Sequence, residues 1–358
     1  MTDIEQQLLA AIRATPMATQ QQLADQLGLS RESVAGHIMR LTRQGVILGK
    51  GYLLPDQDRI VVLGGANVDL TGRCHSAYRP GDSNPGSLSQ SAGGVGRNIA
   101  ENLAHLGHDV TLITLLGNDT NGDWLHQRIA AAGIRTDGLL RHPSLPTSTY
   151  LAMNDHQGQL IGALADMGIA EALTPEILAP VRSTLVAADA VVVEANVPEA
   201  TLAWLATLPL KGRLYADAVS TAKAPRLQPL LPHLKVLKVN RSEASALLGE
   251  ASYEPETLAR RLLERGVNTV ALSLGRDGLM LCTDQQHHRQ GIYPTHIASD
   301  TGAGDALVAG LIHADRAHWE LSHKAAFSLG CAGLTLESSG ANHPHLTETT
   351  VNQWILDR

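Results

Sequence analysis

The stretch ASDTGAGDALVAG, residues 298–310, carries the strongest information about the fold and chemistry of this chain. Gly302, Ala303 and Gly304 lead directly into Asp305, and an apolar stretch with helical periodicity follows. Small residues before a helix leave backbone N–H groups uncovered, and the helix dipole adds partial positive charge there. The pattern therefore predicts an anion hole beside which Asp305 accepts a proton from an attacking hydroxyl. The alternative is a glycine-rich loop in which Asp305 caps the helix.

A second glycine-rich stretch, SAGGVGRNIAENLAHLG, precedes another predicted helix. Gly93, Gly94 and Gly96 would let the backbone approach a ligand closely. Asn98 offers a donor and an acceptor together, which suits vicinal hydroxyls. The pattern is not the dinucleotide-binding GxGxxG, and no strand is predicted directly before it. We therefore expect a ligand with neighbouring hydroxyls rather than a dinucleotide.

A third stretch, GGANVDLTG at 64–72, directly follows the first predicted strand. Asn67 and Asp69 would then lie at the carboxyl end of this strand, where a short carboxylate can hold sugar hydroxyls. An Asx turn explains the same two residues equally well.

Two further polar stretches lie between predicted strands and turns. In KVNRSEA, Asn240 and Glu243 share one helical face, and an amide and a carboxylate so placed can hold hydrated Mg²⁺. A helix N-cap with its capping-box glutamate has identical spacing, so both interpretations stay open. In SLGRDG, Ser273 ends a predicted strand and is followed by Gly275 and Gly278, which suits a nucleotide phosphate or ribose, or a hairpin turn.

Short apolar runs alternate with helical stretches from residue 59 onward; the runs are RIVVLGG, DVTLITLLG, ADAVVVE, GRLYADA, LKVLKVN and NTVALSLG. This alternation predicts a parallel sheet that is covered on both faces. Several runs end in a polar residue, namely Glu194, Asp217, Asn240 and Ser273. The carboxyl ends of the strands carry the site in open α/β sheets. Residues 72–91, which are rich in Pro, Gly, Ser and Asp, match no core element and are expected to form a flap near the site.

Residues 1–54 predict a separate module, which a linker at 55–58 joins to the rest of the chain. A helix that stops at Pro16, a short helix after Thr19, a longer helix after Ser30 and a hairpin at 49–51 follow the order of a winged helix–turn–helix. The basic residues of its recognition helix and wing are Arg31, Arg40, Arg43 and Lys50. They favour operator DNA as a partner, and a helical bundle used for dimerisation or packing is the alternative.

The composition excludes several classes of protein. The 358 residues carry a formal net charge of −7 and are 44% hydrophobic and 18% charged, which indicates a folded core and argues against general coating of nucleic acid. Three widely spaced cysteines indicate reduced thiols in a cytoplasmic protein rather than a disulfide framework. The sequence shows no signal peptide, no run of membrane-spanning length and no histidine cluster suited to a metal.

The number and order of these motifs resemble the ribokinase-like family of carbohydrate and nucleoside kinases, from residue 59 to about residue 345. The resemblance implies a three-layer α/β/α sandwich with a small β lid, in a domain at 59–358, and phosphorylation of a primary hydroxyl by ATP. It makes Asp305 the base and residues 302–304 the anion hole.

Further roles follow from the resemblance and not from spacing. It implies Mg²⁺ at Asn240 and Glu243 and a monovalent cation such as K⁺ at Asp300. The implied ATP-binding residues are Asn240, Ser273, Gly275, Gly278, Thr301, Gly302 and Gly304. The implied substrate-binding residues are Asn67, Asp69, Asp82, Gly94, Asn98, Thr149 and Asp166.

Within the family, the stretches DSNPG (82–86), TSTYLA (147–152) and ADMGIA (165–170) are similar to those of pseudouridine kinases. They imply the 5′-hydroxyl of pseudouridine as the acceptor, with another ribonucleoside or a sugar as the alternative. The family's lids often pair between subunits, so a homodimer is expected. The N-terminal module departs from the stand-alone enzymes. A nucleoside-sensing transcription factor on a kinase fold is therefore the rival function, although the intact Asp305 disfavours it.

Overall fold

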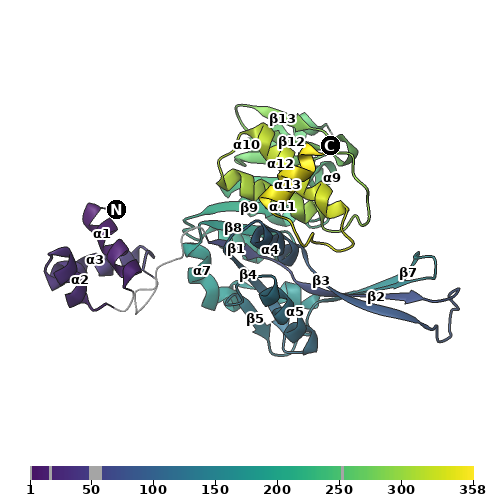
Figure 1. The fold of residues 1–358 in the computed structure, drawn as a ribbon, viewed down its shortest axis with the longest axis horizontal. Helices are drawn as coiled ribbons and strands as arrows, with labels where there is room; N and C mark the ends of the chain where they lie inside the picture. Colours follow the sequence, from purple (N-terminus) through teal and green to yellow (C-terminus); the bar gives the residue numbers. More distant parts are fainter. Residues whose placement is uncertain (1, 16–17, 48–58, 251–253) are drawn as a thin grey trace.

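The computed structural model describes residues 2–15, 18–47, 59–250 and 254–358 (Figure 1). Buried apolar side chains form three clusters: one lies wholly within the N-terminal module, and two lie in the larger domain. In these described ranges, no helix combines the length and apolar character needed to cross a membrane.

The N-terminal module consists of α1 (Asp3–Ala14), α2 (Gln20–Leu27) and α3 (Arg31–Arg43). As predicted, Thr19 caps α2 and Ser30 caps α3, each through a side-chain oxygen that accepts a backbone N–H. The three helices pack on a common core that includes Leu8, Leu23 and Leu41. The hairpin predicted at 49–51 and the linker predicted at 55–58 lie outside the described residues.

The main sheet has nine strands in the order β13-β12-β11-β10-β9-β8-β1-β4-β5. The seven strands from β11 to β5 are parallel, whereas β12 runs antiparallel to both of its neighbours, β11 and β13. Their bounds are β1 Ile60–Leu63, β4 Val110–Gly117, β5 Leu139–His142, β8 Ala190–Glu194, β9 Arg213–Asp217, β10 Leu234–Asn240, β11 Thr269–Ser273, β12 Leu279–Cys282 and β13 His287–Gln290.

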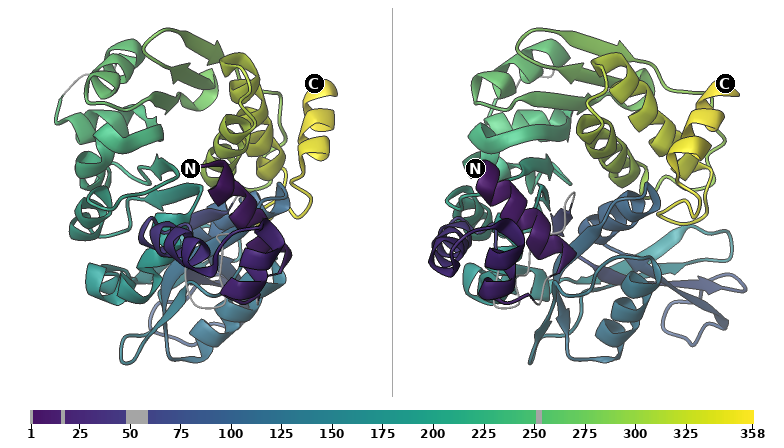
Figure 2. Two further views of the ribbon diagram at one scale, coloured as in Figure 1. Left: turned by 90° about the vertical axis from the view of Figure 1, so that its left-hand side faces the viewer. Right: turned by 60° about the vertical axis from the view of Figure 1, so that its left-hand side comes forward.

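Both faces of this sheet are covered, as the continuous apolar runs predict. Alternate residues of β1 enter opposite clusters: Ile60 and Val62 one, Val61 and Leu63 the other. One layer contains α4 (Val95–His105), α5 (Thr120–Ala131), α11 (Ala303–Arg316), α12 (Leu321–Leu336) and α13 (Glu348–Leu356). The other contains α6 (Pro175–Leu178), α7 (Arg182–Ala187), α8 (Glu199–Ala206), α9 (Arg241–Leu248) and α10 (Pro255–Glu264). The expected three-layer sandwich is confirmed (Figure 2).

A second sheet projects from the body as an arm (Figure 1). Its order is β3-β2-β6-β7, with bounds β2 Asn67–Cys74, β3 Gly86–Gly93, β6 Thr149–Asn154 and β7 Leu160–Asp166. The predicted flap at 72–91 forms part of this sheet: its two ends belong to β2 and β3, and residues 75–85 connect the two strands. We call this four-stranded sheet the lid.

A buried ionic network anchors the C-terminal end of α11. Asp315 accepts hydrogen bonds from Lys324 (2.7 Å), the Tyr215 hydroxyl (2.8 Å) and Arg213 (3.0 Å). Burial would raise the pKa of Asp315, but the bonds from Lys324 and Tyr215 hold it below its ordinary value. This network fixes the helix whose first turn contains Asp305.

Candidate active site

The glycine-rich turn before α11 is held by backbone packing. Gly302 adopts a left-handed φ of 84° at the N-cap. A Cβ on Gly302 would lie 1.9 Å from the carbonyl oxygen of Ala341, so no other residue fits without a shift of this backbone. The first N–H groups of α11, including those of Ala303 and Gly304, have no partner within the helix and are available to an anion.

Asp305 does not cap α11, so the capping interpretation is wrong. It is the third residue of the helix, and Gly302 occupies the cap without a side-chain hydrogen bond. The Asp305 carboxylate instead accepts a 2.7 Å hydrogen bond from the Asn98 amide nitrogen. It lines a cleft of about 360 Å³ together with Asn67, Asp69 and Thr301. The structure thus brings the residues of three predicted motifs into one cleft.

A row of charged residues lies beside Asp305 at the carboxyl edge of the main sheet. Glu194 on β8 pairs with Asp217 on β9, and Asp217 pairs with Lys238 on β10. The Lys238 ammonium is 3.3 Å from Asp217 and lies 3.5 Å from where a Cβ on Gly304 would be. The first turn of α11 therefore has a buried cation next to it.

This charge distribution raises two pKa values. Burial and the charge of Asp217 raise the pKa of Asp305 to about 7, against the opposing effects of Asn98 and Lys238. Burial also raises the pKa of Glu194 to about 7, although backbone N–H groups of Gly65 and Asn196 donate to it. A carboxylate with a pKa near neutrality is suited to proton transfer.

The sequence analysis noted the polar strand ends Glu194 and Asp217 but missed Lys238. A lysine inside the apolar strand LKVLKVN was the available signal, because a charge in a strand covered on both faces needs a partner. It also missed Asn196 and Lys223, which line the cleft and hydrogen-bond to each other. No local pattern marks these two residues.

Asn67 and Asp69 lie at the start of lid strand β2 and not at the end of β1, which stops at Leu63. The Asn67 amide donates a 2.6 Å hydrogen bond to Asp69, and both residues lie in a strand, so the Asx turn is excluded. Burial raises the pKa of Asp69, while Asn67 and Arg97 oppose this rise. Both residues line the cleft at the base of the lid.

The glycines of the second motif fit both roles, because Gly93 and Gly94 line the cleft and close packing leaves no room for a side chain at any of the three. A Cβ on Gly94 would lie 2.5 Å from the Gly65 oxygen, and one on Gly96 would lie 2.7 Å from the Gly64 Cα. Gly93 instead makes room for the Asp69 carboxylate, 2.1 Å from its would-be Cβ. The expectation that no strand precedes this motif is wrong, because β3 runs directly into it.

Three predicted substrate-binding residues do not line the cleft. Asp82 lies in the 75–85 connection at the outer part of the lid, and its carboxylate accepts a hydrogen bond from the Ser83 backbone N–H. Thr149 and Asp166 face each other across β6 and β7, and the Thr149 hydroxyl is already bonded to Asn121 and to the Thr147 carbonyl. Their neighbours Ser148 and Met167 line the cleft instead.

Of the predicted ATP and metal residues, Asn240 and Ser273 pair at the ends of β10 and β11, whereas residues 300–304 lie at the start of α11. Asn240 and Glu243 form a reciprocal capping box, with both bonds at 2.8 Å. The predicted hairpin turn is confirmed as well, because Gly275–Asp277 connects β11 to antiparallel β12. Asp300 is exposed. Across the described ranges, no three His, Cys, Asp or Glu side chains form a group suited to a metal.

Comparison with known proteins agrees with this geometry. The family model described as pfkB family carbohydrate kinase matches residues 57–348. The chain belongs to the pfkB family of carbohydrate kinases. A winged helix–turn–helix DNA-binding model matches residues 1–47.

Two relatives from Escherichia coli (strain K12) exceed 30% identity. The chain is 35% identical to the uncharacterized sugar kinase YeiI, over 97% of each protein. It is 33% identical to a pseudouridine kinase, over 83% of this chain and 96% of the relative. The family establishes the chain as a sugar or nucleoside kinase.

Solved structures share the fold. A carbohydrate kinase from Agrobacterium tumefaciens is 30% identical with a TM-score of 0.75, and the match covers 84% of this chain and 97% of that one. A ribokinase from Arabidopsis thaliana, complexed with ribose and ATP, has a TM-score of 0.73 at 21% identity, over 83% and 98%. The latter similarity concerns the fold alone.

The first prediction concerns Asp305→Asn. The variant keeps the fold and substrate binding but loses about 10²–10⁴-fold in kcat, because the amide cannot take the hydroxyl proton. In the wild-type enzyme, kcat/KM rises with pH through about 7, since Asp305 must be deprotonated to act. Turnover assays and calorimetric binding check this, with Asp137→Asn at an exposed site as the matched control. Turnover near the wild-type level in Asp305→Asn would remove Asp305 as the base.

Proposed function

We propose that this kinase transfers the γ-phosphoryl group of ATP to the 5′-hydroxyl of pseudouridine. One observation carries the proposal: Asp305, whose pKa is raised to about 7, lies in the same cleft as the hydrogen-bonded pair Asn67 and Asp69, for which we propose binding of substrate hydroxyls. The 33% identity to a pseudouridine kinase over nearly its whole length supports the choice of nucleoside.

In this proposal the ribose hydroxyls bind Asp69 and the nucleoside's 5′-hydroxyl faces Asp305. The 5′-oxygen forms a bond to the γ-phosphorus, the bond to the β,γ-bridging oxygen breaks, and ADP leaves. Asp305 takes the hydroxyl proton. Backbone N–H groups of Gly304 and its neighbours, with the Lys238 ammonium beside them, stabilise the charge on the transferred group.

ATP would lie along the ends of β10 and β11, beside Ser273 and the turn at 275–278. Mg²⁺ would neutralise its phosphates near Glu243, whose carboxylate already accepts the Asn240 N–H. Mg²⁺ is commonly bound through one or two carboxylates, water and substrate phosphates, so the absence of a larger acidic cage in the described residues fits. Asp300 is the proposed position for K⁺.

Cysteine usage supports a cytoplasmic location within this proposal. Cys74, Cys282 and Cys331 are all free and buried. Unpaired thiols are typical of proteins in reducing compartments.

Measurement of ADP release across a substrate panel tests the substrate. The panel contains pseudouridine, uridine, cytidine, inosine, guanosine, adenosine, ribose and fructose 6-phosphate, and Asp305→Asn measures the background. We expect the highest kcat/KM for pseudouridine. Preference for another ribonucleoside or sugar keeps the mechanism and rejects the substrate. Nucleoside binding without any turnover favours the rival function, a nucleoside-sensing transcription factor.

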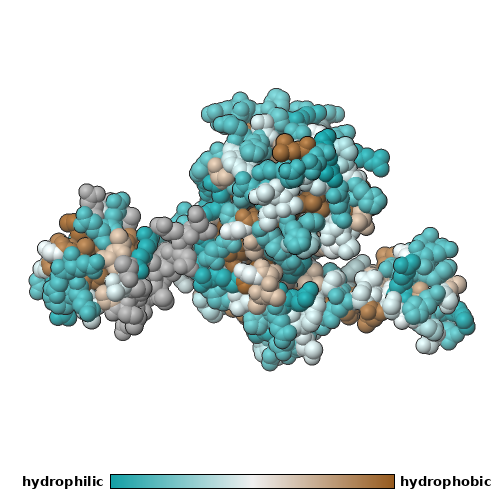
Figure 3. Space-filling view, viewed as in Figure 1, coloured by the Kyte–Doolittle hydropathy of each residue, from teal (hydrophilic) through white to brown (hydrophobic). Residues whose placement is uncertain are grey.

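We also propose a homodimer that pairs through the lid. Cross-strand partners place Leu70, Leu88, Leu151, Met153 and Leu164 on the lid face opposite Asp69. Leu88 and Leu164 are 69% and 66% exposed, and apolar atoms are visible on the arm in Figure 3. An apolar sheet face of this kind is typical of an interface with a second copy.

The second prediction concerns this face. Leu164→Glu places a charge in the proposed interface and converts a dimer into a monomer, as measured by light scattering after gel filtration. Leu356→Glu, at another exposed leucine on α13, leaves the dimer intact. A wild-type protein that elutes with the mass of one chain would contradict the dimer.

A DNA-binding role for residues 1–54 is the second proposed function, which the family match at 1–47 supports. On recognition helix α3, Arg31 and Arg43 are exposed and pair with no other described residue. Arg40 differs, because it donates a 2.7 Å hydrogen bond to buried Glu5 on α1 and contacts His37. Arg40 therefore joins α3 to α1, and its proposed contact with DNA is the weaker one of the three.

The third prediction follows from this difference. We expect the wild-type chain to bind a DNA duplex that has been selected from a random library. The double variant Arg31→Ala with Arg43→Ala binds this duplex more weakly. The slope of log affinity against log salt concentration falls by about 2, one for each lost phosphate contact. Arg260→Ala with Arg261→Ala changes the charge equally on α10 and leaves binding unchanged. Fluorescence anisotropy at several salt concentrations measures both. Equal effects of the two double variants would exclude α3 as the contact.

A further inference from the structure

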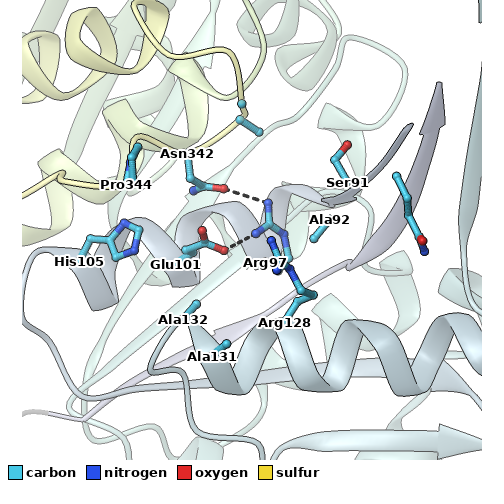
Figure 4. Close-up of a pocket in the computed structure, with 13 residues that line it drawn as sticks. Ser91, Ala92, Arg97, Glu101, His105, Arg128, Ala131, Ala132, Asn342 and Pro344 are labelled. Carbon is cyan, nitrogen blue, oxygen red and sulfur yellow. Dashed lines mark hydrogen bonds and ion pairs between the residues drawn. The ribbon is translucent and has the colours of Figure 1, made fainter. Parts of the chain in front are cut away.

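Arg97 is a buried arginine in the first turn of α4, and no known motif explains it. Its side chain is about 4% exposed. The guanidinium donates to the Gly93 carbonyl (3.1 Å), to Asn342 (2.9 Å), to Glu101 and to Asn98. Figure 4 shows the Arg97 side chain directed between Glu101 and Asn342. These residues and Arg128 line a second cavity of about 440 Å³, which we call the rear cavity.

The bond to Asn98 determines which end of that amide faces Asp305. Arg97 can only donate, so the end of Asn98 that it contacts must be the oxygen. The amide nitrogen is then the end that points to Asp305 and donates to its carboxylate at 2.7 Å. If Asn98 turned over, its oxygen would face the carboxylate and repel it.

Arg97 also reaches the backbone behind the anion hole. The Asn342 side chain accepts from Arg97 and donates a 2.9 Å hydrogen bond to the backbone carbonyl of Asn98, so Asn342 connects the Arg97 side chain to the Asn98 backbone. The residue before it, Ala341, is the one whose carbonyl packs on Gly302. One guanidinium therefore connects the start of α4 with the start of α11.

Burial of this charge is costly unless it is compensated. Burial lowers the pKa of Arg97, and the attraction of Glu101, Asp305 and Asp69 opposes this effect. Arg97 thus lies within electrostatic reach of both the proposed base and the hydroxyl-binding Asp69.

We propose that Arg97 is a positioning residue for phosphoryl transfer: it orients the Asn98 amide and thereby the Asp305 carboxylate. The proposal rests on the proposed function in taking Asp305 as the base. It assigns Asn98 a role in orienting that base, in addition to any contact with substrate hydroxyls.

The decisive measurement is the titration of Asp305 in the whole protein, followed by carbon NMR with labelled aspartate and assigned with Asp305→Asn. Arg97→Met removes the donor that holds the Asn98 amide oxygen, so the amide nitrogen is no longer held toward Asp305. The pKa of Asp305 then rises by about one unit, because its carboxylate loses a stabilising hydrogen bond. The acid limb of kcat/KM moves to higher pH by the same amount, while the KM for ATP changes little. Arg128→Met is the matched control, because Arg128 lines the same rear cavity but stacks on Trp124 at 5.7 Å.

Chemical rescue separates positioning from structure. In Arg97→Ala the rear cavity can admit methylguanidinium, which restores the wild-type titration and turnover, whereas tetramethylammonium does not. If Arg97→Met fails to fold, Asn342→Ala gives a smaller shift in the same direction. An Asp305 titration that is unchanged in a folded variant overturns the proposal. The titration needs no substrate, so failure of the wild-type chain on the nucleoside panel would count against the proposed function alone.

Discussion

The site depends on the charges at the carboxyl edge of the main sheet, where the carboxylates of Glu194, Asp217 and Asp305 lie near the Lys238 ammonium and Lys223 lines the same cleft. Glu194, Asp217 and Asp305 repel one another, and Lys238 pairs directly with Asp217. Burial, together with this repulsion, raises the pKa of Asp305 and of Glu194 to about 7, which makes each carboxylate a stronger proton acceptor that is still partly ionised at neutral pH. A polyphosphate would add negative charge to this region. Under the proposed function, this explains why ATP would arrive with its magnesium ion.

The position of Asp305, the proposed base, depends on two helices whose N-caps are glycines, Gly94 for α4 and Gly302 for α11. Gly96 brings α4 against Gly64, and Gly302 brings the start of α11 against Ala341. A side chain at either position would push the helix away from the neighbouring backbone by steric contact. Asn98 and Asp305 can then meet at hydrogen-bond distance. The far end of α11 cannot drift, because Asp315 holds it to β9 and α12.

The lid follows a different physical rule from the body. Its strands have one polar face that carries Asp69 and one apolar face that carries Leu88 and Leu164. In the body, both faces of each central strand are covered by helices, and alternate residues are equally apolar. No described part of the chain covers the apolar lid face in this way, which is why a second copy is the partner proposed for it.

Much of the fold could be predicted from the sequence because its causes are local. Continuous apolar runs indicate strands that are buried on both faces, and Thr19 and Ser30 mark helix starts through their own side-chain bonds. The family could be predicted as well, since its motifs are short and keep their order. Strand β3 could not, because GSLSQSAG is exposed and lacks apolar alternation, so only pairing with β2 makes it a strand.

The residues of the site, like the elements of the fold, could be predicted from the sequence only in part. Asp305, Asn98, Asn67 and Asp69 could be named as candidates from glycine-rich motifs, but local spacing is identical for a capping box and a metal pair at Asn240 and Glu243. The row from Glu194 to Lys238 depends on which strands are neighbours and in what register. The bond between Asn98 and Asp305 joins residues 207 positions apart. The sequence therefore determined which groups can do the chemistry, and the tertiary structure decided which of them meet, because pKa shifts and hydrogen bonds arise from neighbours in space.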